Sequence, residues 1–313
     1  MDSAERAGVA FRPRMIRRQL GLLAIGLAHG ALLFQGDILS IYAILGLVLL
    51  ALRGISPRKA VKTAIVLIAV SGTLWTLLGL ADIADGAAPD IAAVHAQAAE
   101  TTAALSGSPL SAIREHAGQL PLTAAFVLLL QGPSAMAMFM LGFAAGRRRL
   151  FGDIDALRPL LHRLLRVCLP IGLVGSATYA YLAVFHPGSG AETLGLGIDL
   201  LTAPALTAAY VAAALIAFQT ARGRKVARAL APAGRTALSN YLLQSLVLGV
   251  VFTALGFELI GKLAPIVVLA TVPVVFATQL AVSAWWLHGH AYGPLEWLLR
   301  AITNASRPTW RRS

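Results

Sequence analysis

The stretch "RRQLGLLAIGLAHGALLFQGDILSIYAILGLVLLALRG", residues 17–54, decides the fold class of this chain. A helix needs about 20 apolar residues to cross a hydrocarbon layer of about 30 Å. In lipid, only helices and closed barrels satisfy their own backbone hydrogen bonds, and barrel strands alternate in polarity over about 10 residues. This stretch is too long and too uniformly apolar for barrel strands, so it predicts membrane helices. It nevertheless carries two ionisable residues, His29 and Asp37.

The rest of the chain repeats this composition. Its 313 residues are 58% hydrophobic and 13% charged, whereas soluble domains are about 25% charged. We therefore predict an all-α, polytopic transmembrane bundle that forms a single membrane domain over residues 1–313. Eight spans are expected, at residues 18–35, 37–52, 60–81, 121–146, 165–186, 194–221, 236–256 and 264–288. The last apolar stretch, "YGPLEWLLRAIT" (292–303), is too short to cross and fits an interfacial helix.

The basic residues support this map. All but two of the 26 Lys and Arg residues fall in the N-terminal tail, in every second connection or in the C-terminal tail. The two exceptions are Arg114 and Lys262. Because an excess of Lys and Arg marks the cytoplasmic face, both termini are expected to be cytoplasmic and the localisation is expected to be the cell inner membrane.

The net charge of +12 has the same explanation. The basic clusters flank spans, where they orient the chain and attract anionic lipids at the cytoplasmic face. Nucleic-acid binding is therefore not expected. Nucleotide, metalloprotease and Rossmann motifs are absent from the sequence, so neither a metal site nor a bound cofactor is expected.

The longest connection covers residues 82–120 and is expected on the outer side. Within it, "SPLSAIREHAGQL" (108–120) predicts a short helix with Ser111 as its cap, because Leu110, Ile113 and Ala117 share one face. This helix would form a lid on the membrane. The alternative is a loop without regular structure.

Polar side chains inside spans are costly and persist where they face a partner, the bundle interior or water. His29 is either an imidazole bonded to a neighbouring helix or a general base, a role that suits its ordinary pKa of about 6.5. Asp37 is either a helix N-cap or a carboxylate that orients the histidine. We take the pair as the candidate catalytic residues.

The densest polar signal in a span is "GRTALSNYLLQS" (234–245). Asn240 and Gln244 are four residues apart and share a helix face, where they either join helices or bind substrate. Arg235 stands at the cytoplasmic mouth of this span, where it either anchors the helix or attracts a phosphate. Gln131 precedes a Gly-Pro pair that predicts a kink lining a cavity.

Two long blocks resemble the YeiB family of bacterial inner-membrane proteins. The C-terminal block is "GRTALSNYLLQS…GFELIGKL…WWLHGHAYGPLEWLLRAIT", and "FMLGFAAGRRRLF" fits the middle of the family pattern. The early block carries a G-x-x-H and a G-D-I-L-x-x-Y-A-I-x-G pattern, which includes Tyr42. The resemblance covers roughly residues 14–302, and residues 140–305 match the family's C-terminal region, the domain of unknown function 418.

The resemblance extends to a wider group of transmembrane acyltransferases. It implies transfer of an acyl group from a cytoplasmic thioester donor, with acyl-CoA as the candidate, to a glycan or lipid acceptor at or across the membrane. Asn240, Gln244, Arg235, Tyr42 and Gln131 are then the candidate substrate-binding residues. Family members begin with further spans that this sequence is expected to lack. The alternative function is a transporter or channel-like protein without covalent chemistry.

Overall fold

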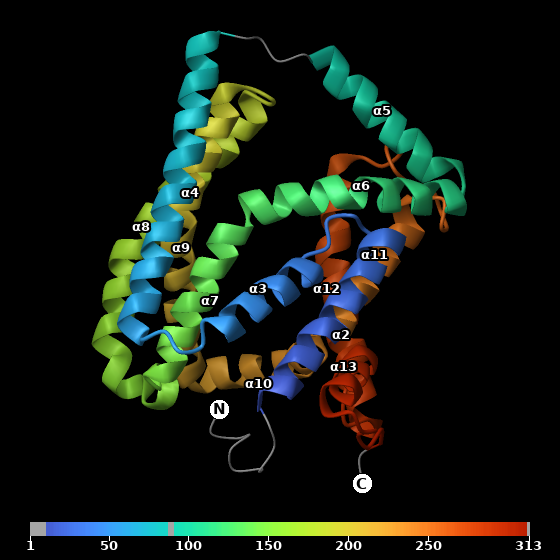
Figure 1. Ribbon diagram of the computed structural model, residues 1–313. Helices are drawn as coiled ribbons and strands as arrows, with labels where there is room; N and C mark the ends of the chain where they lie inside the picture. The colour runs from blue at the N-terminus through green and yellow to red at the C-terminus, as the bar shows by residue number, and fades with distance from the viewer. Residues whose placement is uncertain (1–10, 87–90, 312–313) are drawn as a thin grey trace. The chain divides into compact units, whose positions relative to one another are not determined.

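The computed structural model describes residues 11–86 and 91–311, and over these residues the chain is all-α, as predicted. Arg6, Asp90 and Arg312, which contribute to the charge pattern, lie outside the described residues. The helices (Figure 1) are α2 (Phe11–Leu32), α3 (Leu39–Ala51), α4 (Pro57–Asp85), α5 (Ile91–Gly107), α6 (Pro109–Leu130), α7 (Gly132–Arg147), α8 (Ile154–Phe185), α9 (Gly190–Gln219), α10 (Ala221–Arg235), α11 (Ala237–Phe252), α12 (Pro265–Gly289) and α13 (Pro294–Asn304), with a 3₁₀-helix η1 (Leu150–Gly152).

The expectation of eight spans is met in part. Within the described residues, α4, α8, α9 and α12 are each long and apolar enough to cross a membrane, and α6 with α7 counts as a fifth span if the pair is taken together. The apolar helices α3 and α11 have only 13 and 16 residues. At about 1.5 Å per residue they reach about 20 and 24 Å, short of the ~30 Å hydrocarbon layer. The chain is a multi-pass membrane protein, while the orientation of its termini stays a prediction.

The expected continuous span at 121–146 is interrupted. The helix breaks at Gln131, and Pro133 stands in the first turn of the following helix α7. Pro is tolerated there because its missing N–H would have no acceptor in the first turn. The break therefore falls where the Gly-Pro pair predicted a kink.

Much of the expected connection 82–120 is helical. It holds α5 and the first half of α6, so the predicted helix over 108–120 is present but longer than expected. Its cap is Ser108 rather than Ser111. The Ser111 N–H donates to Ser108 Oγ at 3.0 Å, and the Ser108 N–H donates to Ser111 Oγ at 2.8 Å. This reciprocal pair is a capping box in which a serine takes the usual place of the glutamate.

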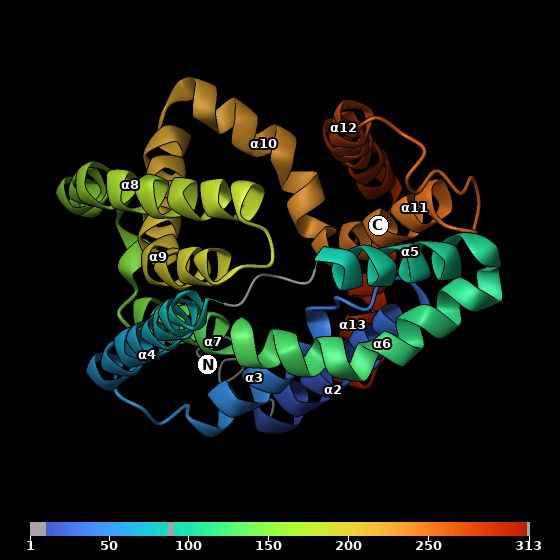
Figure 2. The same ribbon diagram turned by 90° about the horizontal axis from the view of Figure 1, so that it is seen from above.

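Contacts divide the chain into two compact units. Unit 2 comprises Leu52–His95 and Leu128–Lys225, and within it α4 packs against α7 and α9 while α9 packs against α8 (Figure 2). These helices approach closely at glycines: a Cβ on Gly79 would lie 2.3 Å from the backbone N of Leu194. Small residues that let backbones approach are a common means of packing membrane helices.

Unit 1 comprises the described part of Met1–Ala51 together with Ala96–Val127 and Val226–Ser313. Helix α2 packs against α3 and α13, and α13 also contacts α11. Gly21 lets the apolar face of α13 sit on α2, because its Cβ position lies 3.1 Å from Leu299 Cδ1 and from Ile302 Cγ2. The candidate catalytic pair and the block 234–245 both belong to this unit.

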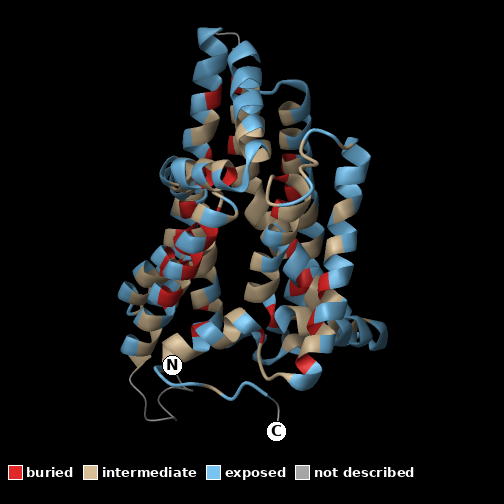
Figure 3. Ribbon diagram, turned by 90° about the vertical axis from the view of Figure 1, so that its right-hand side faces the viewer, coloured by how far each residue is buried: buried red, intermediate tan, exposed pale blue. Residues whose placement is uncertain are grey.

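Large apolar side chains cover the outward helix faces. Val174 on α8 is 67% exposed and Trp285 on α12 is 70% exposed, and exposed positions dominate the ribbon (Figure 3). Apolar exposure on this scale marks a surface that contacts something other than water. On helices of this length, that partner is lipid.

Candidate functional site

The candidate site forms where the chain turns from α2 to α3. His29 lies in the last turn of α2, and its carbonyl oxygen accepts the N–H groups of Leu33 and Phe34, which ends the helix. Asp37 follows in the loop and holds the start of α3. Its Oδ2 accepts the Ser40 N–H at 2.8 Å and the Ser40 hydroxyl at 2.7 Å. Asp37 is therefore a helix cap, one of the two roles predicted for it.

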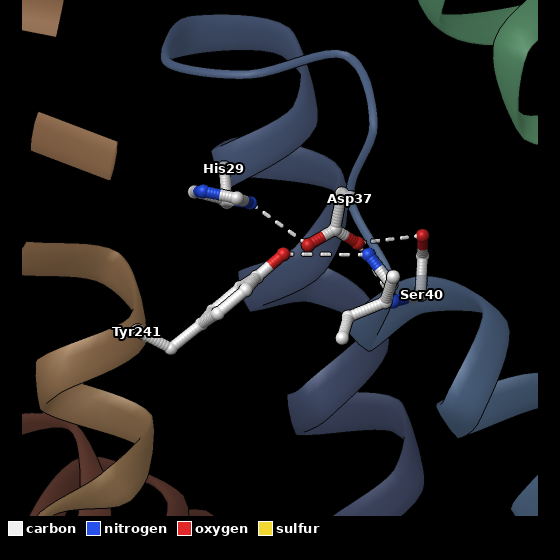
Figure 4. A network of polar contacts seen from close by, with 5 residues as sticks. His29, Asp37, Ser40 and Tyr241 are labelled. Atoms are coloured by element: carbon white, nitrogen blue, oxygen red, sulfur yellow. Dashed lines mark hydrogen bonds and ion pairs between the residues drawn. The ribbon is translucent and has the colours of Figure 1, made fainter. Parts of the chain in front are cut away.

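Asp37 also contacts the histidine, because its other oxygen faces the imidazole. His29 Nδ1 lies 2.8 Å from Asp37 Oδ1 (Figure 4), and both side chains are fully buried. Burial alone would raise the pKa of Asp37. The hydrogen bonds from His29 and Ser40 outweigh burial, so the pKa of Asp37 is lowered from its ordinary value. The carboxylate is thus charged at neutral pH.

This geometry fixes the proton on the imidazole. A carboxylate only accepts hydrogen bonds, so Nδ1 must carry the proton that points at Asp37. In the neutral ring, Nε2 then has a free lone pair. His29 Nε2 is buried and has no hydrogen-bond partner among the described residues. Most buried polar atoms are partnered, so this nitrogen is the feature of the site that calls for a function.

Aromatic rings enclose the imidazole. The Tyr241 ring from α11 lies 4.9 Å from the His29 ring, centroid to centroid, and the Phe34 ring lies 6.5 Å away. The Tyr241 hydroxyl accepts a long hydrogen bond of 3.5 Å from the Ile38 N–H and stands beside the Asp37 carboxylate (Figure 4). Helix α11 thus closes the side of the site that α2 and α3 leave open.

Two further features hold the site in place. Gly26 lies one turn before His29, and a Cβ on it would come within 2.5 Å of the Ser40 N and 2.6 Å of Asp37 Oδ2. The start of α3 and the Asp37 side chain thus lie directly on the α2 backbone. Next to it, His116 of α6 is buried, with Nδ1 2.5 Å from Gln35 Oε1, so the helix predicted as a lid contacts the loop that carries Asp37.

The two carboxamide residues predicted on α11, Asn240 and Gln244, do not contact His29 as Tyr241 does. The Asn240 side-chain amide donates to Ser283 Oγ on α12 at 2.9 Å, and the Gln279 amide of α12 donates to the Asn240 backbone carbonyl at 2.8 Å. These bonds favour the helix-joining role of Asn240. Gln244 is exposed and does not line the site. The structure brings neither carboxamide to His29.

The remaining candidates are dispersed. Tyr42 of α3 is 38% exposed, and Gln131 is exposed in unit 2. Arg235 is exposed at the end of α10, where it donates to the Ala291 carbonyl at 3.3 Å. It lines a separate cavity together with other arginines.

A groove of about 480 Å³ lies between α11 and α12. Its lining is almost wholly apolar, which suits a hydrocarbon chain, and His29 is not part of it. In the described part of the chain, no three His, Cys, Asp or Glu side chains gather in a way that would hold a metal ion.

Comparison with known proteins identifies the family of this chain. The model of the family described as "Protein of unknown function (DUF418)" matches residues 145–306. The chain belongs to the DUF418 family. It is 30% identical to the uncharacterized protein YxaH of Bacillus subtilis over 316 residues, which cover 98% of this chain and 75% of YxaH.

More distant relatives match shorter parts of this DUF418 protein. The uncharacterized YeiB of Escherichia coli is 39% identical over 79 residues, 25% of this chain and 20% of YeiB. An uncharacterized 39.9 kDa protein of Bacillus acidopullulyticus is 26% identical over 180 residues, 54% of this chain and 51% of that protein. No solved structure matches the chain. The family and its membrane character agree with the resemblance seen in the sequence.

Sequence reasoning missed Tyr241 and Ser40. Tyr241 adjoins Asn240 in the polar block of α11, and neighbouring helix residues point about 100° apart. The polar block therefore reaches the His29 ring through Tyr241, the residue beside the predicted Asn240. Ser40 stands three positions after Asp37, where a capping side chain accepts a backbone N–H.

Proposed function

We propose that this protein is a membrane acyltransferase in which His29 is the general base and Asp37 orients it. The observation that carries the proposal is the His29–Asp37 pair with its buried, unpartnered Nε2. A carboxylate on Nδ1 fixes the tautomer and stabilises the imidazolium that forms when Nε2 takes a proton. General-base catalysis of this kind contributes about 10²–10⁴-fold to a rate.

The proposed reaction uses a thioester donor and an acceptor hydroxyl or amine. Nε2 removes the acceptor proton as the acceptor atom attacks the thioester carbonyl. The C–S bond then breaks, and the imidazolium returns the proton to the leaving thiolate. The products are an acyl ester or amide and a free thiol. The resemblance to transmembrane acyltransferases supports acyl-CoA as donor and a glycan or lipid as acceptor, at the inner membrane of a bacterium.

The burial of Nε2 sets a condition on this reaction. His29 is 2% exposed, so an acceptor reaches it only when a covering side chain moves. Phe34 is the best placed for this movement, because it lies in the loop between α2 and α3 and is itself 48% exposed. A site that stays closed without substrate also keeps water from hydrolysing the thioester.

The test is a comparison of His29→Gln with His288→Gln. His288 is an exposed histidine on α12 and leaves the site intact. Both variants are purified in detergent, checked for unchanged elution on size exclusion, and reconstituted into liposomes with acyl-CoA of several chain lengths. Release of free thiol and acylation of extracted lipid or glycan are then measured. We expect turnover in the wild type and in His288→Gln, and a loss of 10²-fold or more in His29→Gln. Equal turnover in a correctly folded His29→Gln would remove His29 from the mechanism.

A second candidate function is proton-coupled transport. Buried ionisable pairs in membrane proteins also serve as proton relays, and the helix break at Gln131 resembles the discontinuous helices of transporters. Under this alternative, liposomes take up a solute in response to a pH gradient, and neither a thiol nor an acylated product appears. His29→Gln would then abolish solute uptake, and neither wild type nor variant would form an acylated product.

A further inference from the structure

A cavity lined by several charged side chains lies in unit 1, away from the histidine. It has a volume of about 450 Å³ and is formed by the first turns of α2, the start of α11 and the side of α13. Four of its lining residues are arginines, Arg14, Arg18, Arg235 and Arg300, and we call it the arginine pocket. None of its lining residues belongs to the site around His29.

The described residues neutralise the positive charge of the arginine pocket only in part. Glu296 is its only lining carboxylate, and both of its oxygens are bonded to Ser239, one to the N–H at 2.9 Å and one to the hydroxyl at 2.6 Å. None of the four arginines has a carboxylate within ion-pair distance among the described residues. Like charges gathered in one cavity repel one another, so an anion would stabilise this arrangement.

The guanidinium groups have donors to spare. Arg14 donates to the Asn304 amide oxygen, Arg235 to a backbone carbonyl, and Arg300 to the Tyr292 hydroxyl. These acceptors are neutral, and each guanidinium has five N–H donors. Arg18 is exposed and has no hydrogen-bond partner in residues 11–86 or 91–311. The pocket therefore offers several charged donors directed at one space.

A helix start adds to the same field. Ala237 and Leu238, the first residues of the 16-residue helix α11, line the pocket. Thr236 precedes them and provides no side-chain cap. First-turn N–H groups have no acceptor within their own helix. In α11 the Ser239 N–H is already bonded to the Glu296 carboxylate, and the helix dipole still favours negative charge at this end. The arginines therefore supply most of the positive charge in the pocket, and the helix start, which Glu296 already caps, adds to it.

We propose that the arginine pocket binds a phosphate group. The planar fork of arginine matches two phosphate oxygens at once, which makes arginine the preferred residue for this anion. The cavity volume far exceeds the share of about 30 Å³ that one water occupies, so the phosphate is part of a larger molecule. That molecule is either a soluble organic phosphate or a lipid with a phosphate headgroup.

The arginine pocket and the proposed general base, His29, both lie along helix α2. Arg18 and His29 are 11 residues apart on this helix, about 16 Å along its axis. A donor with phosphates at one end and a thioester at the other would extend along α2. This last step rests on the proposed function, whereas phosphate binding itself does not.

The experiment compares Arg18→Gln and the double variant Arg18→Gln/Arg235→Gln with the control Arg12→Gln. Arg12 is an exposed arginine on the same helix that does not line the pocket. Full-length protein in neutral detergent at about 0.1 M salt is titrated with inorganic pyrophosphate, and binding is measured by calorimetry and thermal shift. In a second arm, each protein is placed in nanodiscs of phosphatidylcholine with or without phosphatidic acid, and the shift in thermal stability is compared.

We expect at least one probe to bind wild type and Arg12→Gln, with affinity lowered about tenfold in the double variant and less in Arg18→Gln. Pyrophosphate binding in detergent identifies a soluble ligand, and stabilisation by phosphatidic acid alone identifies a lipid. Arg18 has no ion pair or side-chain hydrogen bond within residues 11–86 and 91–311, so Arg18→Gln remains informative if the double variant fails to fold. The proposal is overturned if wild type binds neither probe, or if the variants bind as tightly as wild type. Loss of turnover in His29→Gln with unchanged pyrophosphate binding would separate this site from the proposed catalysis.

Discussion

Asp37→Asn is the substitution that tests the site most directly, because asparagine keeps the shape of the side chain and removes its charge. The amide cannot reproduce all three hydrogen bonds. If its oxygen faces Ser40, its NH₂ faces His29 Nδ1, and the imidazole must switch tautomer to accept it. The proton then moves to Nε2, which is buried without a partner. If the amide is reversed, its NH₂ opposes the N–H of Ser40.

The magnitude follows from the three contacts of 2.7–2.8 Å that Asp37 makes. Hydrogen bonds to a charged group contribute about 1.5–3 kcal/mol and neutral ones about 0.5–1.5 kcal/mol, so the loss is roughly 3 kcal/mol. Relief from burying a charge offsets part of this loss. We therefore expect Asp37→Asn to lower the free energy of unfolding by about 1–3 kcal/mol. Asp37→Ala should cost more, because it leaves three buried donors without an acceptor.

The pH dependence has a definite sign. The pKa of Asp37 is lowered in the folded protein, so its contribution to stability is present above the unfolded value of about 3.9. That contribution is lost as pH falls through the folded pKa. The stability difference between wild type and Asp37→Asn should therefore shrink in acid below about pH 4.

The assay is thermal unfolding in mild detergent from about pH 7 to 3, combined with ¹⁵N NMR of the histidine rings. His29 is assigned among the seven histidines by the resonance lost in His29→Gln. Asp85→Asn, at an exposed carboxylate near the end of α4, is the control and should change stability by less than about 0.5 kcal/mol. If Asp37→Asn is as stable as this control and the His29 tautomer is unchanged, the His29–Asp37 hydrogen bond of 2.8 Å neither stabilises the fold nor sets the tautomer of His29.

Three further substitutions test the packing around and beyond the site. Gly26→Ala places a methyl group 2.5 Å from the Ser40 backbone N at the start of α3 and should cost about 1–3 kcal/mol, whereas the control Gly118→Ala, which meets nothing within 4 Å, should be neutral or stabilising in the same thermal assay. Gly79→Ala should destabilise unit 2 by a similar amount, because its methyl would meet the Leu194 backbone at 2.3 Å; limited proteolysis that shows no loosening of α4 would contradict this. Asn240→Ala should lower the melting temperature through loss of the Asn240 side-chain hydrogen bonds to Ser283 on α12, at about 1–3 kcal/mol, while leaving acyl-CoA turnover intact; a selective loss of turnover would instead support the predicted substrate-binding role.

The sequence determined the fold class and the core of the site. Spacing of apolar runs depends only on the thickness of lipid and the rise of a helix, so membrane helices were predictable. His29 and Asp37 were predictable as a pair because they flank one short turn, and the local chain alone brings them together. The boundaries of the spans were less predictable from the sequence. Helix α2 begins before the arginines that were expected to precede the span, and the break at Gln131 divides one apolar run into two helices.

Only the tertiary structure decided which side chains from distant helices meet. Tyr241 faces His29, while Asn240 beside it faces α12, and this difference depends on the rotation of α11 about its axis, which an apolar sequence does not specify. The arginine pocket likewise joins residues from both ends of the chain. Hydropathy sets how deep a helix lies in a membrane, but the contacts between helices depend on side-chain packing, and packing exists only in three dimensions.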